Sequence, residues 1–275
     1  MKMNRRTFTG LAAGAAATAT MPSPAPAQSD FGKPHPPIVP EDDPAISTEQ
    51  VELSRPDGTV NAYAAYPKGV GATTPGVVLC MAIWGVDAQL RDTVRRYAKA
   101  GYMCIAPDLY SRFNPPNGDG ATDISSFRPM AAKLQRDQYD GDLKAAALHV
   151  RGRAPNAKLG VSGFCMGGHI ALIQALDNSD VFAGVAPFYG AVKDIDPKQM
   201  RMPVCGSYGA QDKSIPADDV KAWAAALTVP HDIKIYPEAG HAFFDDTRSS
   251  YVASAAQDAW TRVQAFFKEQ LGLQS

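Results

Sequence analysis

The chain has 275 residues, of which 45% are hydrophobic and 20% are charged, enough to bury the core of one large α/β domain or two small ones. Its 27 Lys and Arg residues against 28 Asp and Glu residues give a formal net charge of −1, without the basic surplus of a nucleic-acid-binding protein. Four cysteines in a chain of this length do not make a disulfide scaffold. Composition therefore excludes a disordered chain, a nucleic-acid binder and a small disulfide-rich domain.

Residues 1–27 are predicted to be a signal peptide. Arg5 and Arg6 form a twin-arginine pair, a mildly apolar run follows at 11–17, and residues 25–27 form a small-x-small cleavage site. The run is too short and too weakly apolar for a membrane anchor. The segment resembles a bacterial twin-arginine (Tat) signal, which implies export by the Tat machinery. We therefore expect a periplasmic or secreted protein with no stable membrane insertion after cleavage.

The segment after the predicted cleavage site is rich in proline. Residues 28–48 include five prolines between positions 34 and 44, a density that disfavours helices and central strands. We expect an extended arm or linker here, followed by a catalytic domain over residues 49–275. This domain opens with two strands, 51–54 and 59–66, around a Pro-Asp-Gly turn, which is typical of a β-hairpin.

Apolar runs and helical patterns then alternate to the end of the chain. The continuous apolar run at 76–83 is typical of a strand buried on both faces of a parallel sheet. A helical spacing from Leu90 predicts a helix that stops at Gly101, whereas segment 113–138 is irregular. The alternation predicts an α/β fold with one open, mostly parallel sheet and helices on both faces. Further strands are expected at 102–106, 158–161, 181–188, 202–208 and 232–236, and helices at 140–151, 167–176, 216–227 and 251–271.

The strongest chemical motif is centred on Cys165, where a predicted strand passes directly into a helix. Gly163 and Gly167 lie two residues on either side, as in a nucleophile elbow with cysteine in place of serine. The glycines let strand and helix approach around a strained turn, and the start of the helix favours a thiolate at Cys165. The alternative is a glycine-rich packing turn with a buried cysteine. The strand and helix on either side favour the elbow.

A thiol nucleophile requires a base, and the base requires an acid that orients it. In α/β-hydrolases the acid and then the base follow the nucleophile along the chain. Asp212 comes just past the end of one predicted strand, and His241 lies in the loop after the last strand. Cys165, Asp212 and His241 are therefore predicted to meet at one edge of the sheet. Less well placed are His35, His149, His169 and His231, and the rival acids Asp194, Asp218 and Asp219.

From about residue 51 to its end, the sequence resembles the dienelactone hydrolase (carboxymethylenebutenolidase) family of the α/β-hydrolase superfamily. Several motifs agree in the same order, which implies an α/β-hydrolase fold. The matching stretches are 83–86, 101–110, 163–168, 209–212, 238–241 and 251–256.

The resemblance also implies roles for particular residues. Cys165, Asp212 and His241 correspond to the family's catalytic triad, and Arg112 corresponds to an arginine that binds the substrate carboxylate. The family's oxyanion hole implies the backbone N–H groups of Met166 and Ile83. No metal or organic cofactor is implied, and the sequence has neither zinc-site spacing nor a dinucleotide or P-loop fingerprint.

The sequence departs from the family at two positions. Ala82 stands where the family has a glutamate that helps to form the thiolate, so His241 would have to activate the cysteine directly. Asp245 replaces a second substrate-binding arginine, and with Asp246 close by we expect a small anionic dienelactone to be disfavoured.

These features predict a cysteine-dependent hydrolase of carboxylic esters or lactones that works through a thioacyl-enzyme intermediate. Two alternatives stay open: a periplasmic binding protein of the same fold with little turnover, and a thioesterase or acyltransferase with the same nucleophile. Two aromatic residues of the irregular region either stack on substrate or pack in the core; these are Phe127 and Tyr139. Three further cysteines fall in apolar strands and are expected to be buried core residues: Cys80, Cys104 and Cys205.

Overall fold

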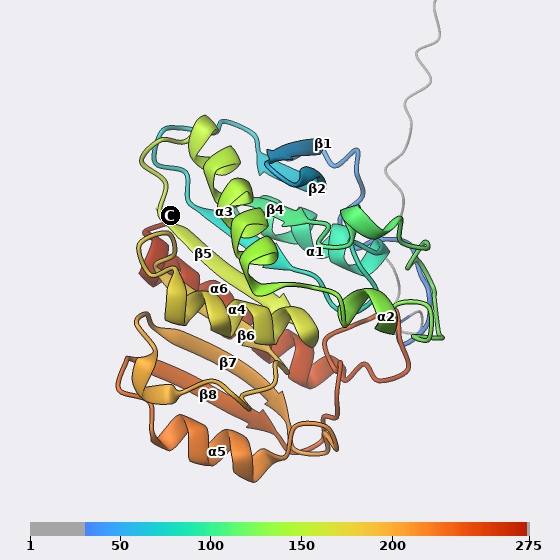
Figure 1. The fold of residues 1–275 in the computed structure, drawn as a ribbon, viewed down its shortest axis with the longest axis vertical. Helices are drawn as coiled ribbons and strands as arrows, with labels where there is room; N and C mark the ends of the chain where they lie inside the picture. The colour runs from blue at the N-terminus through green and yellow to red at the C-terminus, as the bar shows by residue number, and fades with distance from the viewer. Residues whose placement is uncertain (1–30, 274–275) are drawn as a thin grey trace, which may run out of the picture.

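Eight strands form one sheet through the middle of the molecule, which a computed structural model describes over residues 31–273 (Figure 1). The strand order is β1-β2-β4-β3-β5-β6-β7-β8. The β1–β2 and β2–β4 pairs are antiparallel, and all later neighbours are parallel. The strands are β1 (Ile46–Arg55), β2 (Gly58–Pro67), β3 (Gly76–Cys80), β4 (Met103–Pro107), β5 (Leu159–Phe164), β6 (Gly184–Phe188), β7 (Val204–Gly209) and β8 (His231–Tyr236).

Helices cover both faces of this sheet, as the sequence predicts. In Figure 1, α3 and α4 lie in front of the strands, and α1 and α6 lie behind them. Ring contact between Tyr97 of α1 and Trp260 of α6, at 4.8 Å between centroids, joins the two rear helices. The helices are α1 (Ala88–Lys99), α2 (Arg128–Ala131), α3 (Arg136–Arg153), α4 (Met166–Asp177), α5 (Ala217–Ala225) and α6 (Ala253–Leu271), with 3₁₀ turns at Ser111–Phe113 and Pro197–Gln199.

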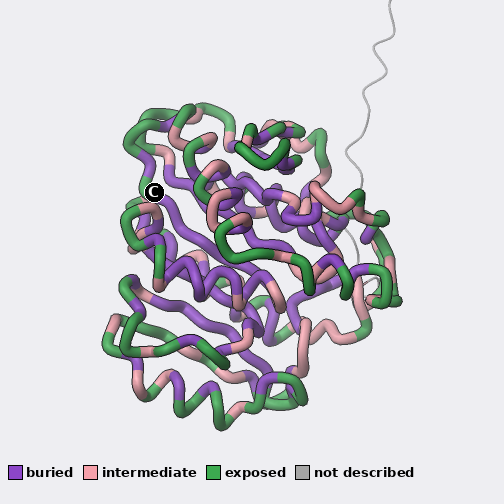
Figure 2. Tube along the Cα trace, in the orientation of Figure 1, coloured by how far each residue is buried: buried purple, intermediate pink, exposed green. Residues whose placement is uncertain are grey.

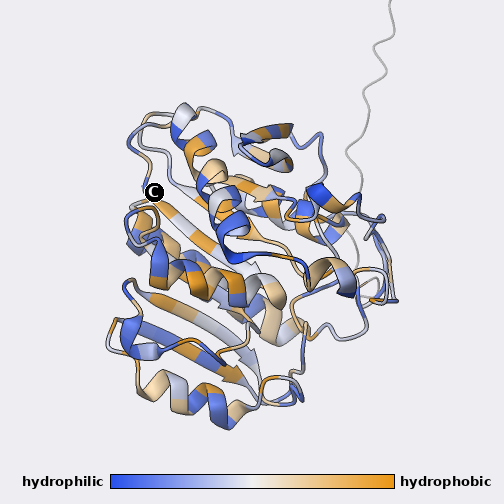
Figure 3. Ribbon diagram, in the orientation of Figure 1, coloured by the Kyte–Doolittle hydropathy of each residue, from blue (hydrophilic) through white to orange (hydrophobic). Residues whose placement is uncertain are grey.

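The centre of the sheet is the core of the molecule. Every residue of β3, β5 and β6 is buried (Figure 2), and for β3 this confirms the prediction from its continuous apolar run. The edge strand β8 instead alternates polar and apolar residues (Figure 3). The predicted boundaries differ in detail: β3 ends at Cys80 rather than at residue 83, and α3 begins at Arg136 rather than at 140. Within residues 31–273, no helix has the length and apolar character of a membrane span.

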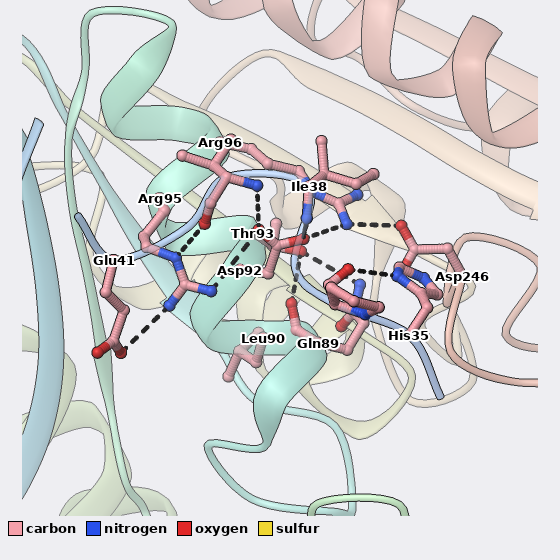
Figure 4. A network of polar contacts seen from close by, with 12 residues as sticks. His35, Ile38, Glu41, Gln89, Leu90, Asp92, Thr93, Arg95, Arg96 and Asp246 are labelled. Atoms are coloured by element: carbon pink, nitrogen blue, oxygen red, sulfur yellow. Dashed lines mark hydrogen bonds and ion pairs between the residues drawn. The ribbon is translucent and has the colours of Figure 1, made fainter. Parts of the chain in front are cut away.

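The described part of the predicted arm is packed against α1 and is not a free linker (Figure 4). Asp92 of α1 accepts hydrogen bonds from the backbone N–H groups of Ile38 and Val39, at 3.1 and 2.8 Å. Arg95 donates to the carbonyl of Val39, whose side chain is buried. Side chains of α1 thus form the hydrogen bonds that these backbone groups of the arm, which lies outside any helix or strand, would otherwise lack. The β1 strand begins at Ile46, within the range predicted for the arm. The predicted signal peptide, residues 1–27, lies outside the described residues, so export and the Tat partnership stay predictions.

Arg96 connects this arm to the loop that carries His241. Its guanidinium pairs with Asp92 on its own helix and with Asp246 on the loop, and both carboxylates are almost fully buried. The loop is also bound to the arm directly, because the backbone N–H of Gly32 donates to the carbonyl of Asp246 at 2.7 Å. The imidazole of His35 lies 3.4 Å from the same carboxylate (Figure 4). One arginine therefore ties together the arm, α1 and the His241 loop.

We predict that Arg96→Ala destabilises the fold by about 3–5 kcal/mol, because it leaves two buried carboxylates without their shared cation. Lys99→Ala is the matched control, since Lys99 lies on the same helix and pairs with Asp43 of the arm but is half exposed. Its loss should cost about 0–1 kcal/mol. Urea unfolding of the two variants measures the difference. Equal destabilisation would contradict the special role given to Arg96.

Candidate active site

The turn between β5 and α4 holds Cys165 in a strained conformation. Cys165 has φ +55° and ψ −116°, a combination that residues with side chains rarely adopt. A Cβ at Gly163 would lie 2.3 Å from the carbonyl oxygen of Gly167, and a Cβ at Gly167 would lie 2.2 Å from that of Cys80. Both glycines are therefore required by backbone contacts. The turn has the geometry that the elbow motif predicts.

The structure brings together the side chains of Cys165, His241 and Asp212. Nδ1 of His241 lies 2.6 Å from Oδ2 of Asp212, and Nε2 lies 3.0 Å from Sγ of Cys165. The second carboxylate oxygen of Asp212 accepts the backbone N–H groups of Ser214 and Ile215, at 2.8 and 3.1 Å. These bonds fix the carboxylate, which in turn fixes the plane of the imidazole. The arrangement can transfer a proton between the sulfur and the ring.

The electrostatics of the site favour a charged imidazole. Burial alone would lower the pKa of His241, but hydrogen bonds to Asp212 and Cys165 and the charges of these two groups raise it to about 10. Burial alone would raise the pKa of Asp212, but His241 and the two backbone N–H groups hold it below its ordinary value. A protonated ring therefore lies against a sulfur at the N-terminus of α4.

Cys165 differs from the other three cysteines in its exposure. All four are free thiols, but only Cys165 is partly exposed. Cys80, Cys104 and Cys205 are buried in strands, which confirms the expectation from the sequence, and burial raises the pKa of each, that of Cys205 to about 11. A thiol reagent in water should therefore reach Cys165 first.

The two backbone groups expected to form an oxyanion hole lie next to Cys165. Met166 is the first residue of α4, and Ile83 lies in the turn after β3 and lines the cavity around the cysteine. Among the backbone hydrogen bonds in the turns and loops of residues 31–273, none has the N–H of Met166 or of Ile83 as its donor. The hydroxyl of Tyr110 donates to the carbonyl of Ile83 at 3.2 Å and helps to hold this turn in place. Both N–H groups are therefore available to an anionic oxygen.

A cavity of about 320 Å³ opens over Cys165 and His241. Its wall is mostly apolar, and the described part of the chain contributes charged side chains from Asp87, Asp245 and Arg248 in addition to His241. Such a cavity suits a small organic molecule held by a few polar groups. Among residues 31–273, the lining consists of Ala82, Ile83, Trp84, Asp87, Gln89, Leu90, Ile124, Phe164, Cys165, Tyr189, Ser214, His241, Ala242, Asp245 and Arg248.

The structure does not bring Arg112 to this cavity. Its guanidinium forms two hydrogen bonds with the buried carboxylate of Asp142, at 2.8 and 2.9 Å, and also pairs with Asp57. Arg112 is therefore occupied by two carboxylates and does not line the cavity. The position of Arg112 therefore does not support the expectation that it binds the substrate carboxylate.

Asp246 also differs from expectation. Only Asp245 of the two neighbouring aspartates faces the cavity, whereas Asp246 points to Arg96 and the arm.

Of the aromatic residues in the irregular region, Phe127 packs edge-on against Trp84, with 5.5 Å between the ring centroids. Neither Phe127 nor Tyr139 lines the cavity, so both are core residues.

Sequence reasoning missed several residues of the cavity wall, among them Trp84, Asp87 and Arg248. Asp87 had a visible signal, because an aspartate just before a predicted helix is a strong N-cap candidate, and its carboxylate does accept the N–H of Leu90 at 3.0 Å. Arg248 had none, since it comes from an irregular loop. Its position depends on tertiary contacts with Asp245, Trp84 and the carbonyl of Ala121.

Within the described residues, no group of three or more His, Cys, Asp or Glu side chains is arranged to hold a metal ion. Of the remaining histidines, His169 contacts the carbonyl of Ala191 at 2.7 Å and His149 contacts the hydroxyl of Tyr66 at 2.9 Å. These contacts give both rings a structural role.

Known proteins resemble this chain in sequence and in architecture. Residues 60–271 match the sequence model of the dienelactone hydrolase family. A "putative carboxymethylenebutenolidase" of Methylorubrum extorquens is 36% identical over 80% of this chain and 80% of its own length, and one of Escherichia coli is 36% identical over 86% and 93%. The crystal structure of a putative dienelactone hydrolase from Klebsiella pneumoniae superposes with a TM-score of 0.75 at 32% identity, covering 82% of this chain and 99% of that one. The match covers most of the chain and most of these relatives, and the chain belongs to the dienelactone hydrolase family.

Proposed function

We propose that this protein hydrolyses carboxylic esters or lactones with Cys165 as its nucleophile, through a thioacyl-enzyme intermediate. The observation that carries the proposal is the unbroken series of contacts from Asp212 through His241 to Cys165, at 2.6 and 3.0 Å. Membership of a hydrolase family supports the reaction class. The cavity above the sulfur has the size for a small ester.

The proposed reaction has two halves. The Cys165 thiolate attacks the carbonyl carbon, and the N–H groups of Met166 and Ile83 bind the oxyanion. The carbon–oxygen bond to the leaving group then breaks, and His241 gives its proton to the departing alkoxide. In the second half, neutral His241 takes a proton from water, the resulting hydroxide attacks the thioester, and the acid leaves while the thiolate and the imidazolium are restored.

Because Ala82 has no ionisable group, His241 alone must activate the thiol of Cys165. Ala82 lines the cavity and brings no ionisable group to the sulfur, whereas His241 contacts it directly. A thiolate–imidazolium pair of this kind needs no additional carboxylate next to the sulfur.

The same pair could act on a thioester substrate, so competition between oxygen esters and thioesters will define the natural substrate class. The intact contacts of His241 argue against a role in binding alone.

We predict that iodoacetamide abolishes ester hydrolysis in step with alkylation of Cys165, because the other three cysteines are buried. Peptide mapping by mass spectrometry measures the labelling, and aryl-ester hydrolysis measures the activity. Cys205→Ala is the matched control and should retain both activity and inactivation by the reagent. Full activity in a protein with alkylated Cys165 would contradict a cysteine nucleophile.

We also predict that hydrolysis of an alkyl ester or lactone stays active through neutral pH and declines as the pH rises through about 10, because deprotonated His241 cannot protonate the leaving alkoxide. Asp212→Asn removes a group that raises the pKa of His241, so the decline should move to lower pH and kcat/KM should fall by about a hundredfold or more. Asp218→Asn, which changes an exposed carboxylate on α5, is the control. An unchanged alkaline limb in Asp212→Asn would contradict the role of this pair.

A further inference from the structure

Three charged side chains share one wall of the cavity above Cys165. Asp87 lies at the N-terminus of α1, and Asp245 and Arg248 lie on the loop after His241. Nε of Arg248 donates to Asp245 at 2.8 Å, and its Nη2 lies 3.6 Å from Asp87. One cation is thus shared between two carboxylates, all three being at least four-fifths buried. This cluster has no part in the proton transfers of the proposed reaction.

Each nitrogen of the Arg248 guanidinium already faces an acceptor of the protein. Besides Asp245, its Nη1 donates to the backbone carbonyl of Ala121 at 2.6 Å. The guanidinium carbon lies 4.0 Å from the centroid of the Trp84 ring, so the aromatic ring covers one of its faces. A carboxylate on a substrate would have to compete with Asp245 and Asp87 for this cation. An uncharged substrate meets no such competition.

We propose that Asp87, Asp245 and Arg248 form a charge selector in the cavity wall that favours uncharged esters and lactones over carboxylate-bearing ones. The proposal rests on the proposed function, because it assigns the substrate class of the same site. In this arrangement Arg248 orients the wall, and its charge is used to neutralise carboxylates of the protein. When Asp87 is neutral, the charges of Arg248 and Asp245 cancel, and the cluster has no net positive charge to attract a substrate carboxylate. When Asp87 is ionised, the net charge of the cluster is negative.

Asp87 makes the selector depend on pH. Burial, and next the negative charge of Asp245, raise the pKa of Asp87 to about 7, against the opposing effects of the Leu90 N–H and Arg248. Raising the pH through this value therefore adds one negative charge to the cavity wall. Carboxylate-bearing substrates should be tolerated below neutral pH and rejected above it.

Other charged groups near Asp87 do not supply the same switch. Asp119, from the irregular segment, adds to the negative potential at Asp87 but is paired with Arg91 of α1 at 2.8 Å. His241 lines the same cavity, and its pKa is raised to about 10. The ring therefore stays charged over the range in which Asp87 titrates. Any effect of His241 on the reaction itself is common to charged and uncharged substrates.

The test compares two substrates of nearly equal shape, 4-acetoxybenzamide and 4-acetoxybenzoate, of which only the second carries a carboxylate. We expect the ratio of kcat/KM for the benzoate to that for the benzamide to fall by about tenfold between about pH 6 and about pH 8.5. In Asp87→Asn, which keeps an N-cap side chain for α1, the ratio should not change with pH. Asp43→Asn removes the same charge far from the cavity wall, against Lys99, and should keep the wild-type slope.

A second variant tests the other carboxylate. Asp245→Asn leaves Arg248 with less compensation, so the benzoate should gain relative to the benzamide at every pH. A ratio that is independent of pH in the wild type, or a slope that survives in Asp87→Asn, would overturn the selector. If neither ester is hydrolysed, the proposed function fails, and the two compounds are then stable ligands of the unmodified protein. Calorimetric Kd values for both across the same pH range would test the selector by the same ratio.

Discussion

The close approach of β5 and α4 at Cys165 is the constraint on which the rest of the site depends. The positive φ of Cys165 costs about 1–3 kcal/mol in a residue with a side chain, and the surrounding packing must hold it. Gly163 and Gly167 allow the contact because any Cβ there would collide with backbone. The result places the sulfur at the start of a helix and in the lining of the cavity. Every other group of the site is positioned relative to this one atom.

The loop after β8 supplies the proposed base and two charged residues of the cavity wall, and its outer side is held by the amino-terminal arm. His241, Asp245 and Arg248 face the cavity, whereas Asp246, between them in sequence, faces Arg96 and the arm (Figure 4). One buried ion pair therefore anchors the segment that presents both the proposed base and the charged cavity wall. The arm contacts this loop through the backbone, at the hydrogen bond from Gly32 to the carbonyl of Asp246.

Local pattern predicted the fold and the centre of the site well. The continuous apolar run at 76–83 predicted the buried strand β3, and the elbow motif predicted the turn at Cys165, because strand burial and glycine spacing are visible directly in the sequence. The positions of Asp212 and His241 just after predicted strands were enough to predict that both lie near Cys165, as the structure places them. A family correspondence misplaced Arg112, since its pairing with Asp142 depends on how α3 packs. The position of Arg248 likewise depends on contacts between distant segments, which no local pattern encodes.

Mass spectrometry of the acyl-enzyme tests the central claim most directly. The protein would be mixed with an ester of a hindered acid, which acylates thiols and is released slowly, and quenched in acid during turnover. With Cys165 as the nucleophile, we expect a mass increase equal to the acyl group, located on the peptide that contains Cys165 and removed by hydroxylamine. Turnover without any adduct on that peptide, or an adduct on another residue, would contradict Cys165 as the nucleophile.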